Sequence, residues 1–246
     1  MKYSRNIVPS ILTMLNLFFG FFSIVNALQG KFVAAAWLIM IAAVWDALDG
    51  KLARLTSTYS EFGVEFDSIS DVVSFGVAPS ILIYQVFLER LGAVGVIISF
   101  FPLLFGAIRL ARFNVSIEGF EKENFTGLPI PAMAVALSAY VIFNYDLWEG
   151  LRYAPLMIPL VLFLCYLMVS NIEYEMLPKF SFRENKRNTV VFSLLIAGIV
   201  LVVVFRQKAI FPLAFGFILF YFFRSVLTSN KVEEPEDEVF DVSLPE

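Results

Sequence analysis

Long runs of apolar residues dominate this chain, and they constrain its fold more than any other feature. Hydrophobic residues make up 59% of the 246 residues and charged residues 16%, whereas a soluble domain is about half apolar and about a quarter charged. A helix that crosses a bilayer needs about 20 mainly apolar residues. The candidate stretches are Val8–Leu28, Phe32–Asp49, Val72–Leu88, Ala93–Phe113, Ile130–Tyr145, Ala154–Val169, Val190–Phe205 and Ile210–Leu227. We therefore predict an all-α, polytopic membrane helix bundle with about eight transmembrane helices.

The positions of Lys and Arg indicate how such a bundle is oriented, because cytoplasmic loops carry an excess of basic residues. If the N-terminus is cytoplasmic, 13 of the 18 Lys and Arg residues lie on the inner side. These are Lys2, Arg5, Lys51, Arg54, Arg109, Arg112, Lys122, Lys179, Arg183, Lys186, Arg187, Arg224 and Lys231. We expect an integral protein of the cell membrane with both termini in the cytoplasm.

Four aspartates lie at the predicted inner ends of the second and third spans. Asp46 and Asp49 are three residues apart, so they share one face of a helix. Asp67 and Asp71 are four residues apart and share a face of the next helix. The segment between the pairs is long enough to end one helix, turn near residues 56–60 and return antiparallel to it. We therefore expect the four carboxylates to converge at the inner mouth of the bundle, facing the cytoplasm.

Such a cluster needs compensation, because neighbouring carboxylates cannot all stay ionised unaided. The chain has no His and one Cys, Cys165, which excludes His-based catalysis, zinc chemistry and disulfides. Hard divalent cations such as Mg²⁺ or Mn²⁺ prefer oxygen ligands, and two of them would neutralise four carboxylates. Paired cations of this kind promote in-line attack at phosphorus. The cluster therefore predicts a metal-dependent phosphoryl-transfer site.

The residues around the aspartates suit a phosphate ligand. Gly50 and Ala53 leave room for a diphosphate near the backbone, and Arg54 offers a planar fork to its oxygens. Gly63 opens matching space on the opposing helix. Each small residue, taken alone, is also typical of helix packing in membranes, and a single Asp could cap a helix or pair with Arg54. A cation transporter is the alternative from another class, but it predicts acidic residues on the later spans, which have almost none.

The pattern Asp-x2-Asp-Gly-x2-Ala-Arg-x8-Gly-x3-Asp-x3-Asp from Asp46 to Asp71 resembles, at every position, the signature of the CDP-alcohol phosphotransferases. These are integral membrane enzymes of phospholipid synthesis. Ser60 also lies where many members have a serine. Further stretches are similar to the members that use serine as acceptor, namely VPSILTMLNLFFGF, FDSISDVVSFGVAPS, RLARFN and FTGLPIPA. The resemblance extends from Val8 to Ala132.

The resemblance implies a role for each matching residue. The two divalent cations would be held by Asp46, Asp49 and Asp67, while Asp71 would contact one of them and act as general base. The CDP moiety would be cradled by Gly50, Ala53, Arg54, Ser60 and Gly63. Thr13 and Asn16 are candidates for lining the nucleotide pocket, although interhelical hydrogen bonds are an equal alternative for polar residues in a first span. The implied reaction transfers a phosphatidyl group from CDP-diacylglycerol to the hydroxyl of L-serine and releases CMP.

An amino-acid acceptor carries a carboxylate and needs a cation. Arg109 and Arg112 lie at the inner end of the fourth span and are the candidates, with Arg109 the deeper of the two; snorkelling to lipid headgroups is the alternative. The segment Phe125–Pro129 is expected to form a turn, either near the acceptor pocket or as a purely structural connection. Glycerol phosphate or inositol phosphate as acceptor would demand a denser basic cluster. An archaeol-type donor lipid cannot be distinguished from diacylglycerol by these residues.

The acidic residues define a separate segment at the end of the chain. Seven of the 22 Asp and Glu residues follow Asn230, a composition typical of a disordered, solvated tail. We expect a transmembrane catalytic domain over residues 1–230 and an acidic cytoplasmic tail over residues 231–246. The expected partners are membrane lipids, the two substrates and, by resemblance, a second copy in a homodimer, with no nucleic acid.

Overall fold

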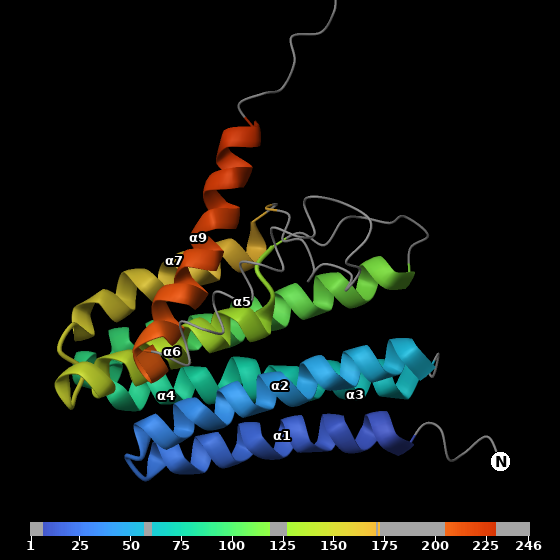
Figure 1. The fold of residues 1–246 in the computed structure, drawn as a ribbon, viewed down its shortest axis with the longest axis horizontal. Coiled ribbons are helices and arrows are strands. Elements are labelled where there is room, and N and C mark those ends of the chain that lie inside the picture. The colour runs from blue at the N-terminus through green and yellow to red at the C-terminus, as the bar shows by residue number, and fades with distance from the viewer. Residues whose placement is uncertain (1–6, 57–60, 119–126, 171, 173–204, 230–246) are drawn as a thin grey trace, which may run out of the picture.

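The computed structural model describes residues 7–56, 61–118, 127–170, 172 and 205–229, and all regular structure in these ranges is helical (Figure 1). The α-helices are α1 (Ile7–Leu28), α2 (Phe32–Thr56), α3 (Glu61–Asp71), α4 (Ala78–Val86), α5 (Ala93–Glu118), α6 (Ile130–Trp148), α7 (Met157–Val169) and α9 (Ile210–Ser229). A π-helical turn, η1 (Val72–Val77), joins α3 to α4, and short 3₁₀ turns are η2 (Leu88–Leu91), η3 (Ala154–Leu156) and η4 (Arg206–Ala209).

Six of the described helices are long and apolar enough to cross a membrane. They cover Ile11–Leu28, Phe32–Leu52, Phe62–Val86, Ala93–Asn114, Ile130–Trp148 and Arg206–Ser225, and a shorter apolar helix covers Ala154–Val169. These helices correspond to seven of the predicted spans, which confirms an all-helical membrane fold. The remaining one, Val190–Phe205, lies outside the described residues apart from its last position, so the count of eight stays a prediction.

The second and third spans extend beyond their apolar cores. Helix α2 continues to Thr56 and α3 begins at Glu61, with residues 57–60 between them outside the described part. Helices α3, η1 and α4 form one continuous rod over Glu61–Val86. Figure 1 shows α2 running antiparallel to this rod, as the length of the segment between the two aspartate pairs predicted. The rod differs from the predicted plain helix because η1 interrupts it directly after Asp71. Such π-helical turns are rare and often mark functional sites.

The core lies where α4 and α6 pass through the bundle. Leu82 and Ile83 of α4 and Ile142 of α6 have no exposed surface, and Leu137 has 1%. In the candidate membrane-crossing segments Phe62–Val86 and Ile130–Trp148, 61% of the residues are buried. In Arg206–Ser225, which includes most of α9, 11% are buried. Helix α9 crosses the other helices steeply (Figure 1). Helices α4 and α6 are thus the most buried helices of the described bundle.

The start of α6 is tied to the end of α7. Gly127 adopts a φ of 86°, which favours glycine, and its N–H donates to the carbonyl of Ile172 at 2.8 Å. The N–H of Leu128 donates to the carbonyl of Leu167 at 2.9 Å. The predicted turn over Phe125–Pro129 therefore has a structural role in its described part, Gly127–Pro129; residues 125 and 126 lie outside the described part.

Candidate functional site

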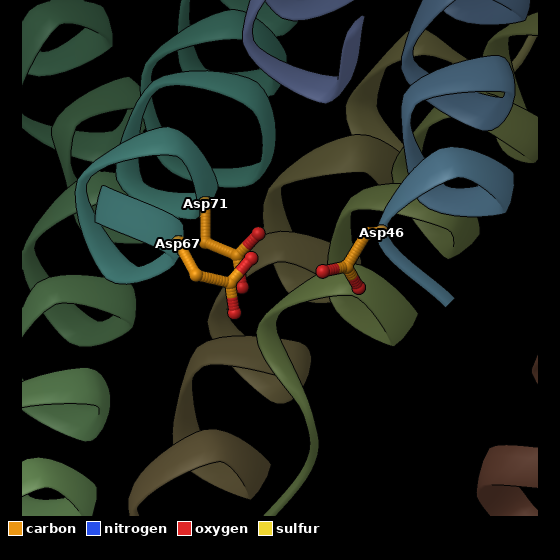
Figure 2. A group of neighbouring side chains, drawn as sticks. All are labelled: Asp46, Asp67 and Asp71. Atoms are coloured by element: carbon orange, nitrogen blue, oxygen red, sulfur yellow. The ribbon is translucent and has the colours of Figure 1, made fainter. Parts of the chain in front are cut away.

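Three of the predicted aspartates form one cluster. One carboxylate oxygen from each of Asp46, Asp67 and Asp71 lies within 4.8 Å of the other two. Figure 2 shows Asp67 and Asp71 side by side on the rod, with the carboxylate of Asp46 facing them from α2. The two antiparallel helices therefore bring together side chains that are about 20 positions apart in the chain, as the i, i+3 and i, i+4 spacing requires.

Asp49 belongs to the same site but stands apart from these three. It is 6% exposed, and one of its carboxylate oxygens accepts a hydrogen bond from the hydroxyl of Thr13 on α1. It interacts electrostatically with Asp46 and Asp67. The sequence predicted that four carboxylates converge. The structure has three in a cluster and a fourth turned towards α1, where Thr13 donates to one of its oxygens.

Asn16 provides the second contact from α1. This side chain is completely buried, and its Nδ2 donates to Oδ1 of Asp71 at 3.0 Å. Thr13 and Asn16 were predicted either to line the nucleotide pocket or to form interhelical hydrogen bonds. The structure shows the interhelical hydrogen bonds, from Thr13 to Asp49 and from Asn16 to Asp71. A role in lining the nucleotide pocket remains a prediction.

Two serines attach the same stretch of α1 to the rod. The hydroxyl of Ser70 donates to the carbonyl of Thr13 at 3.2 Å, and that of Ser74 donates to the carbonyl of Asn16 at 2.9 Å. Each of the two α1 residues therefore binds an aspartate through its side chain and a serine through its backbone. Sequence analysis missed both serines, although two buried hydroxyls four residues apart in an apolar helix were a usable signal.

Close approach of the helices makes these contacts possible. At Gly20, one turn beyond Asn16, an added Cβ would lie 2.6 Å from Cα of Ser74. Real Cβ atoms do not approach so closely, so only glycine lets α1 lie against η1 here. The hydrogen bonds of Asn16 and Ser74 lie next to this contact. Gly20 thus sets the distance over which α1 can reach the aspartates.

The predicted CDP-binding residues are placed only in part. Gly50 is exposed on α2, and no described heavy atom lies within 4 Å of an added Cβ, which disfavours the packing alternative and leaves the space that a phosphate would need. Gly63 is half-buried on α3. Ala53 and Arg54 lie on the last turns of α2, where their side chains are outside the described part, and so is Ser60. Their contacts with CDP remain predictions.

The two arginines on α5 differ in environment. Arg112 is exposed, whereas Arg109 is half-buried and its Nε is shielded from solvent without a hydrogen-bond partner in the described part of the chain. Arg109 also interacts electrostatically with Asp71. Only Arg109 of this pair therefore belongs to the surroundings of the cluster.

The cluster fits a divalent cation. It offers only oxygen ligands, which suits Mg²⁺ and Mn²⁺. Oδ1 of Asp49 and Oδ1 of Asp67 are buried and accept no hydrogen bond from any described group. Burying a charged oxygen costs free energy unless a partner compensates it. These two oxygens could therefore each coordinate a cation.

Comparison with known proteins identifies the family. Residues 6–172 match CDP-alcohol phosphatidyltransferase. The chain belongs to this family. The match to CDP-alcohol phosphatidyltransferases includes every residue of the predicted site, from Thr13 to Arg112, so the resemblance inferred from the aspartate spacing is confirmed.

Individual relatives agree with this assignment. The chain is 38% identical to the CDP-diacylglycerol–serine O-phosphatidyltransferase of Helicobacter pylori over 91% of its own length and 94% of the relative's. It is 40% identical to the archaetidylserine synthase of Methanothermobacter thermautotrophicus, over 68% of the chain and 69% of the relative. The enzyme of Methanocaldococcus jannaschii that carries the same name as the Helicobacter enzyme is 39% identical over 70% of the chain and 75% of the relative.

Proposed function

We propose that this enzyme transfers a phosphatidyl group from CDP-diacylglycerol to the hydroxyl of L-serine and releases CMP. The observation that carries the proposal is the cluster of Asp46, Asp67 and Asp71, in a chain whose family and relatives act on CDP-alcohols by name. The similarity to the CDP-diacylglycerol–serine O-phosphatidyltransferase of Helicobacter pylori spans nearly the whole of both chains, which supports serine over a phosphorylated alcohol as acceptor.

Two divalent cations, Mg²⁺ or Mn²⁺, are proposed to bind at the carboxylates. Asp46, Asp67 and Asp71 supply the clustered oxygens, and the free Oδ1 of Asp49 adds a further ligand. Bound there, the cations would neutralise the carboxylates and polarise the phosphoryl oxygens. Thr13 and Asn16 keep Asp49 and Asp71 in their orientations through the hydrogen bonds from α1.

In the proposed mechanism Asp71 is the general base. Asn16 holds Oδ1 of Asp71 and so fixes the orientation of the carboxylate that is proposed to accept the proton of the serine hydroxyl. As the proton moves, the serine oxygen forms a bond to the phosphorus that carries the lipid. The bond from that phosphorus to the bridging oxygen breaks, and CMP leaves with the electron pair. Gly50, Ala53, Arg54, Ser60 and Gly63 are proposed to hold the CDP moiety.

A direct displacement is simpler here than a covalent intermediate. The hydroxyls of Ser70 and Ser74 donate to backbone carbonyls of α1, so neither is paired with a base that could activate it. Cys165 is buried in α7. These contacts support one in-line step from CDP-diacylglycerol to product.

The same proposal includes an orientation and an assembly. The basic residues favour an active site that faces the cytoplasm, with both termini on that side, a catalytic unit over residues 1–230 and a tail over residues 231–246. Exposed apolar side chains along α1, such as Phe18 and Phe21, suit contact with lipid or with a second copy in a homodimer. Protease digestion of the tail in inside-out but not in right-side-out vesicles would test the orientation.

An archaeol-type donor is the second candidate, and the similarity to an archaetidylserine synthase favours it. Because the tails of the donor are remote from the phosphorus, the same residues would perform the same step on either lipid. Parallel assays with CDP-diacylglycerol and CDP-archaeol decide between them.

The decisive experiment is CMP release by the purified protein in lipid vesicles. We expect release that requires both CDP-diacylglycerol and L-serine, that stops with EDTA and that returns with Mg²⁺ or Mn²⁺. Release with glycerol phosphate or inositol phosphate but not with serine would contradict the acceptor. No release with any alcohol would contradict the enzyme and favour cation transport instead.

A further inference from the structure

The loop between α6 and α7 is tied to α6 by hydrogen bonds, although it lies far from the aspartates. Figure 1 shows this loop at the end of the bundle opposite to the end where α2 stops and α3 begins. The phenol of Tyr140 donates to the carbonyl of Tyr153 at 2.6 Å, and the N–H of Tyr153 donates to Oδ1 of Asn144 at 3.5 Å. Asn144 is 1% exposed. These side chains fix the backbone of Tyr153 and, with it, the position of the neighbouring Arg152.

A cluster of aromatic rings continues from this loop to the start of α9. The ring centroids of Trp148 and Tyr153 lie 5.1 Å apart, and those of Phe143 and Trp148 lie 5.8 Å apart. Phe211 of α9 contacts Phe143 and Tyr140, with centroid distances of 5.6 and 5.1 Å. Tyr153 is nevertheless 46% exposed. The cluster therefore joins α6, the loop and α9, and it presents an amphipathic ring at the surface.

Three exposed cations lie beside these rings. The guanidinium carbon of Arg152 lies 6.0 Å from the centroid of the Tyr153 ring, a distance at which the face of a ring attracts a cation. Arg206 and Lys208 lie on η4, which packs against α6 directly before α9 begins. All three cations are exposed, and none forms an ion pair with a described carboxylate. They are therefore available to a ligand of negative charge.

The boundary of the membrane falls at the same residues. The candidate membrane-crossing segment of α6 ends at Trp148, and that of α9 begins at Arg206. Trp and Tyr are enriched where hydrocarbon meets the headgroups, and Arg binds phosphate through two parallel hydrogen bonds. Asp146 and Glu149 are the carboxylates at this end of α6, so the three cations remain in excess. A lipid phosphate therefore suits this position better than a soluble partner.

We propose that this surface binds the phosphate of an anionic phospholipid in the leaflet opposite to the aspartates. It consists of Trp148, Arg152, Tyr153, Arg206 and Lys208. The bound lipid bridges the α6–α7 loop and η4. Such a bridge stabilises α9, because only 11% of the residues in Arg206–Ser225 are buried within the protein. The lipid is a structural partner and not a substrate, since this surface and the carboxylates lie at opposite ends of the bundle.

The test measures thermal unfolding of the full chain in a neutral detergent, titrated with dioctanoyl phosphatidylglycerol or dioctanoyl phosphatidylcholine. We expect phosphatidylglycerol to raise the melting temperature more, because a ligand that binds only the folded state stabilises it. Arg152→Gln, Arg206→Gln and Lys208→Gln should each weaken the apparent affinity about fivefold, the effect of one basic residue near anionic lipid. Lys31→Gln is the matched control and should leave the affinity unchanged, since Lys31 is an exposed cation in the turn between α1 and α2 at the same end.

A second measurement places the surface in the membrane without altering it. In Trp37→Phe/Trp45→Phe, Trp148 is the remaining one of the three tryptophans. Its fluorescence in vesicles should be quenched more by lipids brominated near the glycerol than by lipids brominated near the chain end.

Four results would overturn the proposal. Two are equal stabilisation by both phospholipids and an equal loss of affinity in Lys31→Gln. The third is equal stabilisation by inorganic phosphate, which would indicate a site for a free anion. The fourth is stronger quenching by the deeper bromines, because it would place Trp148 in the hydrocarbon.

Discussion

The α1–α4 part of the bundle and the α6–α9 part are both apolar, yet they are held together by different interactions. In the described part of the chain, buried side chains between α1, α2 and the rod donate five directional hydrogen bonds, from Thr13, Asn16, Ser23, Ser70 and Ser74. Between α6, α7 and α9 the side-chain contacts include aromatic pairs, beside the backbone hydrogen bonds that join the start of α6 to the end of α7. Phe211 lies 5.1 Å from Tyr140 between ring centroids, and Phe163 lies 5.5 Å from Phe222.

This difference shows in which part of the bundle the side chains must be held in a defined geometry. A hydrogen bond fixes a distance and a direction, whereas aromatic rings tolerate a range of offsets. Directional bonds in a membrane protein are therefore expected where side chains must keep a chemical geometry. The α6–α9 part needs only close packing around that site.

The largest effect should come from removing the proposed base. Asp71→Asn keeps the size of the side chain but cannot accept the serine proton, so kcat should fall about 10²- to 10⁴-fold, while CDP-diacylglycerol still binds. Steady-state CMP release measures this. The matched control is Asp146→Asn at the exposed end of α6, which should keep the wild-type rate. A near-normal rate in Asp71→Asn would eliminate Asp71 as the base.

The next effect should come from the hydrogen bonds of α1. Asn16→Leu leaves Asp71 without its donor, and loss of a residue that orients a metal ligand costs about 10- to 100-fold in activity or metal affinity. We expect a lower kcat, a higher metal requirement and an unchanged KM for serine. Asn26→Leu is the control, because the side-chain amide of Asn26 donates to the carbonyl of Phe22 in its own helix and not to an aspartate. Equal losses in both variants would show that Asn16 is merely structural.

Helix spacing should have a smaller, structural effect. Gly20→Ala forces a methyl group against Ser74, and such overpacking costs about 1–3 kcal/mol. Thermal unfolding in detergent measures the loss. Gly216→Ala in α9 is the matched control, since no described heavy atom lies within 4 Å of an added Cβ there. If both variants melt alike, the contact between α1 and η1 is not tight.

The smallest effect is expected in the aromatic part. Phe215→Leu removes ring contacts with Phe163 and Phe211, each worth about 0.5–1.5 kcal/mol. The melting temperature should fall slightly, and the activity of the folded protein should not change. A large loss of activity without a loss of stability would mean that α9 contributes to the site and that the two parts are not distinct.

Helical periodicity made the cluster predictable. Spacings of three and four residues fix which side chains share a face, and a short connection makes neighbouring helices antiparallel, so Asp46, Asp67 and Asp71 had to meet. The rotation of α1 about its own axis is not encoded in such a pattern. The partners of Thr13 and Asn16, and the displacement of Asp49 that follows from them, therefore required coordinates.

The arginines illustrate the same limit. Arg109 and Arg112 are three residues apart at the membrane edge, and the sequence favoured Arg109 only because it is the deeper of the two. The structure separates them by their surroundings, because Arg112 is exposed whereas Arg109 is half-buried and its Nε is shielded from solvent. The π-helical turn was also invisible, since its residues read as an ordinary apolar helix.

That turn has a consequence for how the rod tolerates change. Each residue in an α-helix advances the rotation by about 100°, so deleting one position from Val72–Val77 would convert the turn to regular α-helix and swing Asp67 and Asp71 away from Asp46. The buried side of α4 would keep its contacts with α5 and α6. The angle between the aspartate face of α3 and the buried face of α4 therefore depends on the extra residue in the π-helical turn. We expect a chain with one residue deleted there to assemble in the membrane, but with its carboxylates no longer in contact.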